Sequence, residues 1–458
     1  MNAWLLEWCK RLIATPSVTT DGTRRIAELC VTELLAPAKI ETRIIPSVRE
    51  GADQVNLLAV VPGRDSGATP LVLNTHLDTV PPGDRAQWTE CGGDPFAPTI
   101  VEDRIYGLGA ADTKLDFIAK VASLTGCGKP RRTTYLVATF GEEHGLIGAK
   151  EIADAGMLPR GAMAFVGEPS QLKLITAHKG LSVFVLEIGF TPSRLDRSTR
   201  AQKSIFVGRA AHSSTPALGM NAIRLALAAV AQPGLKIIAI RGGDAVNKVA
   251  ARCDVTWASD SARPLNGASQ IESAESIGGE FIPAEAIATA SHFVDSLYEF
   301  AERASPAEDD FAQPTLTCNA GVIESAPGRI RVEFELRSPP SLSMSELRHR
   351  VRSLVADLPR DGSVELKLHE GRANPGFRCA AATETIECAL AAMTRASLAL
   401  ETGVKAGCTE AGIYAAAGLN PVVIGPGPSV GVIHAPNEYN LLPQVEAAVR
   451  FYSELLES

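Results

Sequence analysis

The amino-acid sequence predicts an α/β domain with a mostly parallel sheet, interrupted by an inserted α+β domain. At 458 residues the chain exceeds what one hydrophobic core usually holds. Its first third alternates helical and strand patterns, as parallel sheets do. From residue 179 half-exposed, alternating strands take over, and the first pattern returns after residue 370. We therefore expect residues 1–178 and 371–458 to form one domain and residues 179–370 to form the inserted domain.

The elements of the first domain follow from apolar periodicity and from the turn residues between the apolar runs. In chain order we expect helices at 3–14 and 24–35, strands at 56–61 and 70–75, a helix at 114–124, strands at 134–140 and 162–166, a helix at 382–398, a strand at 421–424 and a helix at 443–456. Polar loops follow these strands. Open α/β sheets place their active sites beyond the carboxyl ends of their strands.

The inserted domain is predicted in the same way. In chain order we expect a strand at 181–190, a helix at 216–230, an extended segment at 235–240, a helix at 284–301, extended segments at 314–323 and 329–336, and a helix at 345–358. The acidic, small-residue-rich stretch 260–310 gives no other clear pattern. We interpret GRANPGF, at 371–377, as a turn.

Composition excludes several classes of function. The net charge is -8 and the chain has no basic tract, so we expect no nucleic-acid partner. No stretch approaches the ~18 apolar residues of a membrane span, and the first residues lack the pattern of an export signal. The nine cysteines are scattered without CxxC spacing, which predicts neither a disulfide framework nor a thiolate zinc site. We therefore expect reduced thiols and a cytoplasmic protein.

The stretch LVLNTHLDTVPP, at 71–82, ends an apolar run with His76 and Asp78. Residues two apart in a strand share a face, so these side chains leave the strand side by side. A neutral imidazole can bind a cation through one ring nitrogen while a carboxylate accepts the N–H of the other. Considered alone, a histidine at the end of a strand is more often structural or loosely solvated than a metal ligand.

Other stretches also place carboxylates or histidines where loops leave strands. They are Asp112 in YGLGAADTK, Glu142 and Glu143 in FGEEHG, Glu168 in VGEPS and His434 in GVIHAP. Each has a structural alternative, such as a helix cap or a solvated loop. Together with His76 they supply two histidines and several carboxylates, the ligands that a two-metal hydrolase uses. GLGAAD imitates a dinucleotide fingerprint but has Asp where the last glycine belongs.

The combination of HLD, GAADTK, GEE, GEP and HAPNE resembles the two-metal aminoacylase, acetylornithine deacetylase, succinyl-diaminopimelate desuccinylase and dipeptidase family of metallopeptidases. The motifs stand in the family's order along nearly the whole chain. The resemblance implies two ligand sets joined by one carboxylate, with His76 and Glu168 on one metal, Glu143 and His434 on the other, and Asp112 bridging. It also implies that Asp78 orients His76 and that Glu142 is the general base.

The inserted domain resembles the family's lid and dimerisation domain. GRAAHSSTPALGMNAI is similar to the lid motif, whose His212 contacts the reacting carbonyl oxygen, often from the partner subunit of a homodimer. VNKVA and ELRSPP are similar to segments whose Asn247 and Arg337 bind a substrate carboxylate. The sequence departs from the family at Leu108, where arginine is usual, and lacks the usual proline after Asn247. Its long insertion resembles the larger dipeptidase members, so one chain could also supply its own His212.

These features predict a two-metal amidohydrolase that cleaves a dipeptide or an N-acyl amino acid bearing a free carboxylate. Zinc is the expected metal, with manganese or cobalt as alternatives, because histidine and carboxylate ligands accept all three. One alternative is hydrolysis of a non-peptide C–N bond, such as deamination of an amino-substituted aromatic acid. Another is a non-catalytic binding protein with a decayed site.

Overall fold

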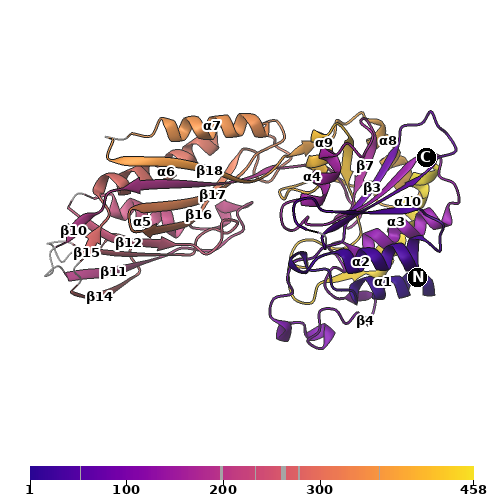
Figure 1. Ribbon diagram of the computed structural model, residues 1–458, viewed down its shortest axis with the longest axis horizontal. Helices are drawn as coiled ribbons and strands as arrows, with labels where there is room; N and C mark the ends of the chain where they lie inside the picture. The colour runs from indigo at the N-terminus through magenta and orange to yellow at the C-terminus, as the bar shows by residue number, and fades with distance from the viewer. Residues whose placement is uncertain (52, 196–199, 233, 259–264, 277–278, 360–361) are drawn as a thin grey trace. The chain divides into compact units, whose positions relative to one another are not determined.

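The computed structural model describes residues 1–458 except 52, 196–199, 233, 259–264, 277–278 and 360–361. The chain folds into two compact units (Figure 1). Unit 1 comprises Met1–His178 and Phe377–Ser458, and unit 2 comprises Lys179–Gly376.

Unit 1 is built on a nine-stranded sheet of order β1-β2-β6-β3-β7-β21-β8-β19, with β20 paired to β8. Its strands are β1 Thr42–Pro46, β2 Val55–Val61, β3 Leu71–His76, β6 Thr134–Thr139, β7 Met163–Val166, β8 Leu174–His178, β19 Phe377–Arg378, β20 Thr402–Lys405 and β21 Asn420–Val423. The central strands β6, β3, β7 and β21 are parallel, and antiparallel strands flank them. The expected α/β class with a largely parallel centre is confirmed.

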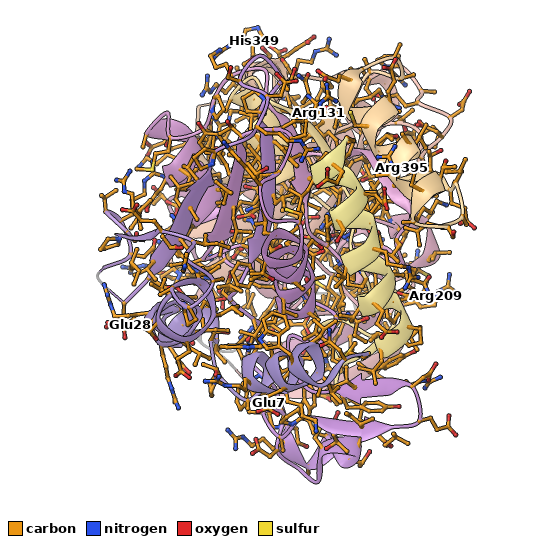
Figure 2. The ribbon with its side chains drawn as sticks, turned by 90° about the vertical axis from the view of Figure 1, so that its right-hand side faces the viewer. Glu7, Glu28, Arg131, Arg209, His349 and Arg395 are labelled. Carbon is orange, nitrogen blue, oxygen red and sulfur yellow. The ribbon has the colours of Figure 1, made fainter. Side chains whose placement is uncertain are left out.

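Helices cover this sheet, and their exposed faces are charged. They are α1 Ala3–Ile13, α2 Arg24–Leu29, α3 Lys114–Gly126, α4 Ile147–Asp154, α8 Glu384–Arg395, α9 Ala411–Ala416 and α10 Leu442–Glu457. Helix α3 packs against α1, α10 and β3, whereas α4 packs against α9. Glu7, Glu28 and Arg395 lie on the exposed sides of α1, α2 and α8 (Figure 2). The apolar sides bury the core.

The register of β3, β6 and β7 brings the ends of these strands together. His76 pairs with Thr139, and Asn74 pairs with Val166. Leu71, Val72 and Leu73 are fully buried, as expected of a central parallel strand covered on both faces. The loops that follow the three strands therefore leave the sheet at one edge.

A buried ion pair lies beneath this edge. The Lys120 ammonium contacts the Asp116 carboxylate at 2.6 Å and donates to the backbone carbonyls of Asn74 on β3 and Phe165 on β7. The Tyr452 hydroxyl donates to Asp116 at 2.6 Å. Because a buried charge needs a partner and hydrogen bonds, this network fixes β3 and β7 relative to α3.

A small sheet completes unit 1. It consists of β4 Thr99–Val101, β5 Arg104–Tyr106 and β22 Tyr439–Leu441, in the order β22-β5-β4. The rings of Tyr106 and Tyr439 lie 5.5 Å apart across the β5–β22 pair. This pairing holds the segment after His434 against the loop that carries Asp112.

Unit 2 is an α+β domain, as expected. Its eight-stranded sheet has the order β14-β11-β13-β12-β16-β17-β9-β18, and every pairing in it is antiparallel. The strands are β9 Leu181–Phe190, β11 Arg200–Val207, β12 Lys236–Gly242, β13 Arg252–Ala258, β14 Gln270–Ser276, β16 Thr317–Ala326, β17 Arg329–Arg337 and β18 Val364–Asn374; β10 Ser193–Leu195 and β15 Gly279–Phe281 pair separately, and the helices are α5 Ala222–Val230, α6 Ala284–Arg303 and α7 Met344–Ala356. Phe334 stacks on Phe184 and meets Phe293 edge-on in its core.

Three local expectations change. The segment GRANPGF is not a turn, because β18 continues to Asn374 and therefore runs past residue 370, where we expected the inserted domain to end. The helix expected at 216–230 starts with a 3₁₀ turn and resumes as α5, whose first turn Asn221 caps by accepting from Ile223 and Arg224. The helix expected at 24–35 ends in a π-helical turn at Cys30–Leu35.

The stretch 260–310, which gave little pattern, contains β14, β15 and α6. Residues 260–264 and 277–278 of this stretch lie outside the described residues. Among the helices that the structure describes, none combines the length and the apolar character needed to cross a membrane.

Candidate metal centre and active site

Three neighbouring strands deliver most of the predicted ligands. His76 is the last residue of β3, Glu142 and Glu143 follow β6, and Glu168 follows β7. All of these side chains leave the sheet at the edge described above. His76 is 1% exposed and Glu168 6% exposed, so this part of the site is buried.

Asp112 lies between the two predicted histidines. Its Oδ1 atom is 3.2 Å from Nε2 of His76, and its Oδ2 atom is 3.2 Å from Nε2 of His434. His434 also approaches Oε1 of Glu143 at 3.0 Å. One carboxylate thus faces both halves of the site, which is the arrangement a bridging ligand needs.

Two groups of side chains could each hold a metal ion, and they share Asp112. One group is His76, Asp112 and Glu168, and the other is Asp112, Glu143 and His434. Within each group the potential ligand atoms lie within 4.8 Å of one another. Imidazole nitrogens and carboxylate oxygens are a donor set that suits zinc and manganese alike. The residues present therefore fit two divalent cations. Glu142 forms a third group with His76 and Glu143 but belongs to neither of these two.

The pKa shifts at the site indicate that its carboxylates favour bound positive charge. Burial and the neighbouring Glu168 raise the pKa of Glu142 well above its ordinary value. Burial would also raise the pKa of Asp112, but hydrogen bonds from His434 and His76 outweigh it and lower the pKa. Hydrogen bonds to Asp112 and Glu143 raise the pKa of His434 to about 11. Without a bound cation, the carboxylates hold protons on the site.

Asp78 organises the site in two ways. Its backbone carbonyl lies 3.0 Å from Nδ1 of His76 and can only accept, so that nitrogen carries the proton and Nε2 faces Asp112. Its carboxylate accepts the backbone N–H groups of Glu142 at 3.1 Å and Glu143 at 3.3 Å. The carboxylate oxygen Oδ1 is 3.5 Å from Nδ1 of His76. Asp78 thus contacts His76 chiefly through its main chain, and its side chain fixes the loop after β6.

The chain segments that carry the three predicted residues of unit 2 contact one another within that unit. The backbone N–H of Ser213 donates to the carbonyl of Asn247, and His212 pairs with Lys248 in an isolated bridge. Nη2 of Arg337 reaches the Ser213 hydroxyl at 3.4 Å. Residues from three distant segments therefore meet within unit 2.

Two details of these segments bear on their chemistry. Nδ1 of His212 accepts the backbone N–H of Ser214 at 3.1 Å, so in the neutral imidazole the proton sits on Nε2. The side chain of Arg337 is 7% exposed, and its Nε donates to Glu335 at 2.7 Å. Glu335 also accepts the Ser213 hydroxyl at 2.5 Å. Arg337 is therefore held in place by a buried carboxylate.

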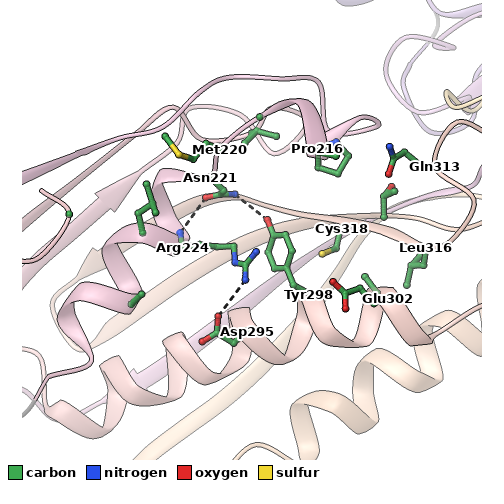
Figure 3. A pocket seen from close by; sticks show the side chains of 18 of the residues that line it. Pro216, Met220, Asn221, Arg224, Asp295, Tyr298, Glu302, Gln313, Leu316 and Cys318 are labelled. Atoms are coloured by element: carbon green, nitrogen blue, oxygen red, sulfur yellow. Dashed lines mark hydrogen bonds and ion pairs between the residues drawn. The ribbon is translucent and has the colours of Figure 1, made fainter. Parts of the chain in front are cut away.

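Unit 2 also has a cavity of about 910 Å³, shown in Figure 3. Arg224 lies 4.1 Å from the centre of the Tyr298 ring and pairs with Asp295 at 3.9 Å. None of the predicted site residues lines this cavity. His212, Asn247 and Arg337 thus lie outside its lining.

Comparison with known proteins decides the family. The sequence model of peptidase family M20/M25/M40 matches residues 72–458 of this chain. An acetylornithine deacetylase from Klebsiella pneumoniae is 32% identical over 296 residues, which are 57% of this chain and 68% of that protein. The chain belongs to peptidase family M20/M25/M40. The resemblance read from its motifs is confirmed.

Solved M20 structures share the fold over the full chain. The aminoacylhistidine dipeptidase of Vibrio alginolyticus has a TM-score of 0.69 at 16% identity, covering 99% of this chain and 96% of its own. An M20 metallo-carboxypeptidase of Sulfolobus solfataricus has a TM-score of 0.63 at 16% identity, covering 100% and 99%. The M20 chain described here is thus a hydrolase acting on amide bonds. Deamination of an aromatic acid is not favoured, and the complete ligand groups oppose a decayed site.

Sequence reasoning missed Glu438, which is 1% exposed and lies behind Asp112. Its Oε1 atom accepts the backbone N–H groups of Ala111 at 2.8 Å and Asp112 at 3.0 Å. The only signal for it was its place in HAPNE, four residues after His434. Glu438 thereby ties the loop of one predicted ligand to the segment of another.

Sequence reasoning also missed Lys405, the last residue of β20. Its ammonium lies 2.9 Å from Oε2 of Glu168. Burial alone would lower the pKa of Lys405, but Glu168 and Asp112 raise it above its ordinary value. No local pattern in TGVKAG distinguishes this lysine from a surface residue.

The contacts of Glu438 lead to a prediction. Glu438→Ala leaves two buried N–H groups without an acceptor, at a cost of roughly 1–3 kcal/mol each. We expect this variant to unfold at lower denaturant concentration and to retain less metal, as measured by urea titration and elemental analysis. Glu438→Gln keeps an oxygen in the same place and is the matched control. Equal losses in both variants would contradict a role based on accepting these two hydrogen bonds.

Proposed function

We propose that this chain is a two-metal amidohydrolase that cleaves a dipeptide or an N-acyl amino acid bearing a free carboxylate. The observation that carries the proposal is the pair of ligand groups joined by Asp112. The names of similar proteins support the substrate class: one is an acetylornithine deacetylase, another a dipeptidase and another a metallo-carboxypeptidase. Zinc is the proposed metal, with manganese and cobalt as alternatives.

The proposed ligands divide as the geometry groups them. His76 and Glu168 would hold one metal, Glu143 and His434 the other, and Asp112 would bridge them. When bound, two such cations lower the pKa of a shared water towards about 7 and polarise the scissile carbonyl. Nδ1 of His76 donates to Asp78, which leaves Nε2 free for coordination.

Glu142 is the proposed general base. It lies beside both ligand groups without belonging to the two that share Asp112, so its carboxylate is available to take a proton from water. A hydrogen bond from its own backbone N–H to the Asp78 carboxylate holds its loop in place. After attack on the amide carbon, the same carboxyl can deliver the proton to the leaving amine.

His212, Asn247 and Arg337 are proposed to bind the substrate. The Nε2–H of His212 is a donor suited to the oxyanion that forms at the reacting carbonyl. Arg337 and Asn247 would bind the free carboxylate, and the Glu335 contact keeps the guanidinium in one orientation beforehand. The family resemblance further suggests a homodimer, in which His212 comes either from the same chain or from the partner.

We also propose a cytoplasmic location. Burial raises the pKa of the Cys9 and Cys30 thiols to about 12, which suits stable, reduced thiols. We expect no nucleic-acid or membrane partner, given the net charge of -8.

A substrate screen tests the proposed reaction. The metal-loaded protein should release amino acids from dipeptides or from N-acyl amino acids, measured by chromatography with a chelator-treated sample as the control. Aminobenzoates should be left unchanged. Release of ammonia from aminobenzoates without any amide cleavage would contradict the proposal.

A second prediction concerns the base. Glu142→Gln should retain both metals but lose about a hundred- to ten-thousand-fold in turnover, because only proton transfer is removed. Asp112→Ala should lose metal, because both halves use that carboxylate. Elemental analysis and turnover are measured side by side, with Glu7→Gln on the exposed side of α1 as the control. A metal-free or fully active Glu142→Gln protein would show that its role is assigned wrongly.

A third prediction concerns the carboxylate contact. Arg337→Met should weaken substrates with a free carboxylate by roughly 2–5 kcal/mol relative to their amidated analogues, as measured by kcat/KM. The comparison uses two substrates on one protein, because the variant also leaves Glu335 buried without its partner. That loss of stability affects both substrates alike. Equal losses for the two substrates would refute the pairing.

A further inference from the structure

The two halves of the candidate metal centre differ in their nearest cation. Lys405 approaches Glu168 at 2.9 Å, within the half that contains His76. In the other half, the ion pairs of the described residues give Glu143 only His434 as a partner. A lysine side chain therefore stands beside one half and not the other.

Lys405 and a divalent cation would use the same carboxylate. A lysine ammonium is positively charged at neutral pH, and it neutralises part of the charge of Glu168. A cation bound by His76, Asp112 and Glu168 would lie within a few ångströms of that ammonium. Repulsion between charges at such a distance is weakly screened in a buried site, and the Lys405 side chain is only 21% exposed.

The second half lacks this opposition and is more open to solvent. The His434 side chain is 49% exposed, against 1% for His76. Water and salt screen the charges around His434 more effectively, so a distant cation has less effect there. The effect of Lys405 should thus be largest in the half that contains its own partner and smaller in the other half, which shares only Asp112 with it.

We propose that Lys405 competes with a divalent cation for Glu168 and so selectively weakens metal binding in the His76–Asp112–Glu168 half. The inference rests on the proposed function, because it requires two metal-binding halves. It adds a physical reason for the two halves to bind metal with different affinities. When the first cation leaves, the ammonium holds Glu168 in place, and the half that contains His434 keeps its cation to lower free-metal concentrations.

The experiment measures zinc affinity in each half separately. The His434→Ala background cripples one half and leaves the Lys405 half to be titrated. The Glu168→Ala background does the reverse. Chelator-treated protein is titrated with Zn²⁺ against a competing chelator, and elemental analysis gives the number of ions bound. Circular dichroism verifies that each variant is folded.

Neutralising Lys405 should strengthen zinc binding chiefly in the half that contains Glu168. In the His434→Ala background, Lys405→Met should bind Zn²⁺ at least about tenfold more tightly. Lys405→Gln removes the charge but keeps a hydrogen-bond donor, and it should give the same gain. It replaces Lys405→Met in the test if the Met variant does not fold. In the Glu168→Ala background, either substitution should change the affinity much less, because that half shares only Asp112 with the surroundings of Lys405.

Two controls separate this effect from general changes of charge. Lys405→Arg keeps the charge and should bind Zn²⁺ as the parent does. In the β8–β20 ladder, Leu174 pairs with Thr402 at one end and His178 pairs with Lys405 at the other. Lys173 precedes Leu174 and therefore lies at the end opposite Lys405. Lys173→Met removes the same charge there and should leave the affinity unchanged.

The possible failures are distinguishable. If the otherwise unaltered protein binds two Zn²⁺ ions but Lys405→Met and Lys405→Gln change neither half, the competition is refuted and the proposed function stands. Equal tightening in both halves, or loss of zinc on removing Lys405, refutes it too. If the unaltered protein binds no Zn²⁺, Mn²⁺ or Co²⁺, the two-metal function itself fails.

Discussion

The crowding of carboxylates at one edge of the unit 1 sheet is the constraint on which the rest of the site depends. Asp112, Glu142, Glu143 and Glu168 lie close together and are largely removed from water. Like charges in such a place repel, and each loses hydration. The site therefore requires positive charge, which the histidines and Lys405 supply in part and which two divalent cations would complete.

The protein keeps these groups in place through buried polar contacts below and behind them. Beneath the edge, the Lys120 ammonium joins the carbonyls of β3 and β7 and is paired with Asp116. Behind Asp112, Glu438 accepts two backbone N–H groups. Both contacts are made to backbone groups, so the side chains at the edge remain available to bind metal ions. Preorganisation of this kind holds the mutually repelling carboxylates close together in a fixed geometry.

Unit 2 follows the same principle with opposite charge. Arg337 is a cation in a buried position, and Glu335 balances it in advance. The Ser213 hydroxyl contacts both side chains, and the Ser213 backbone N–H donates to the carbonyl of Asn247. Beside this contact, His212 pairs with Lys248 in an isolated bridge. If Arg337 binds the substrate carboxylate as proposed, its orientation is already fixed by Glu335, so little side-chain entropy would be lost on binding.

The sequence by itself determined the class of fold, the family and a set of candidate ligands. It could do so because His76 ends, and Glu142 and Glu168 follow, strands that are readable from their apolar runs. The carboxyl ends of strands in a parallel sheet meet at one edge. Only the tertiary structure revealed the contacts of Glu438 and Lys405, since each meets its partner more than two hundred positions away. The place of Glu438 in HAPNE did not show which groups it contacts, and no local pattern marks Lys405. The continuation of β18 to Asn374 was hidden for the same reason: pairing with β9 extends a strand through glycine and asparagine residues that otherwise favour a turn.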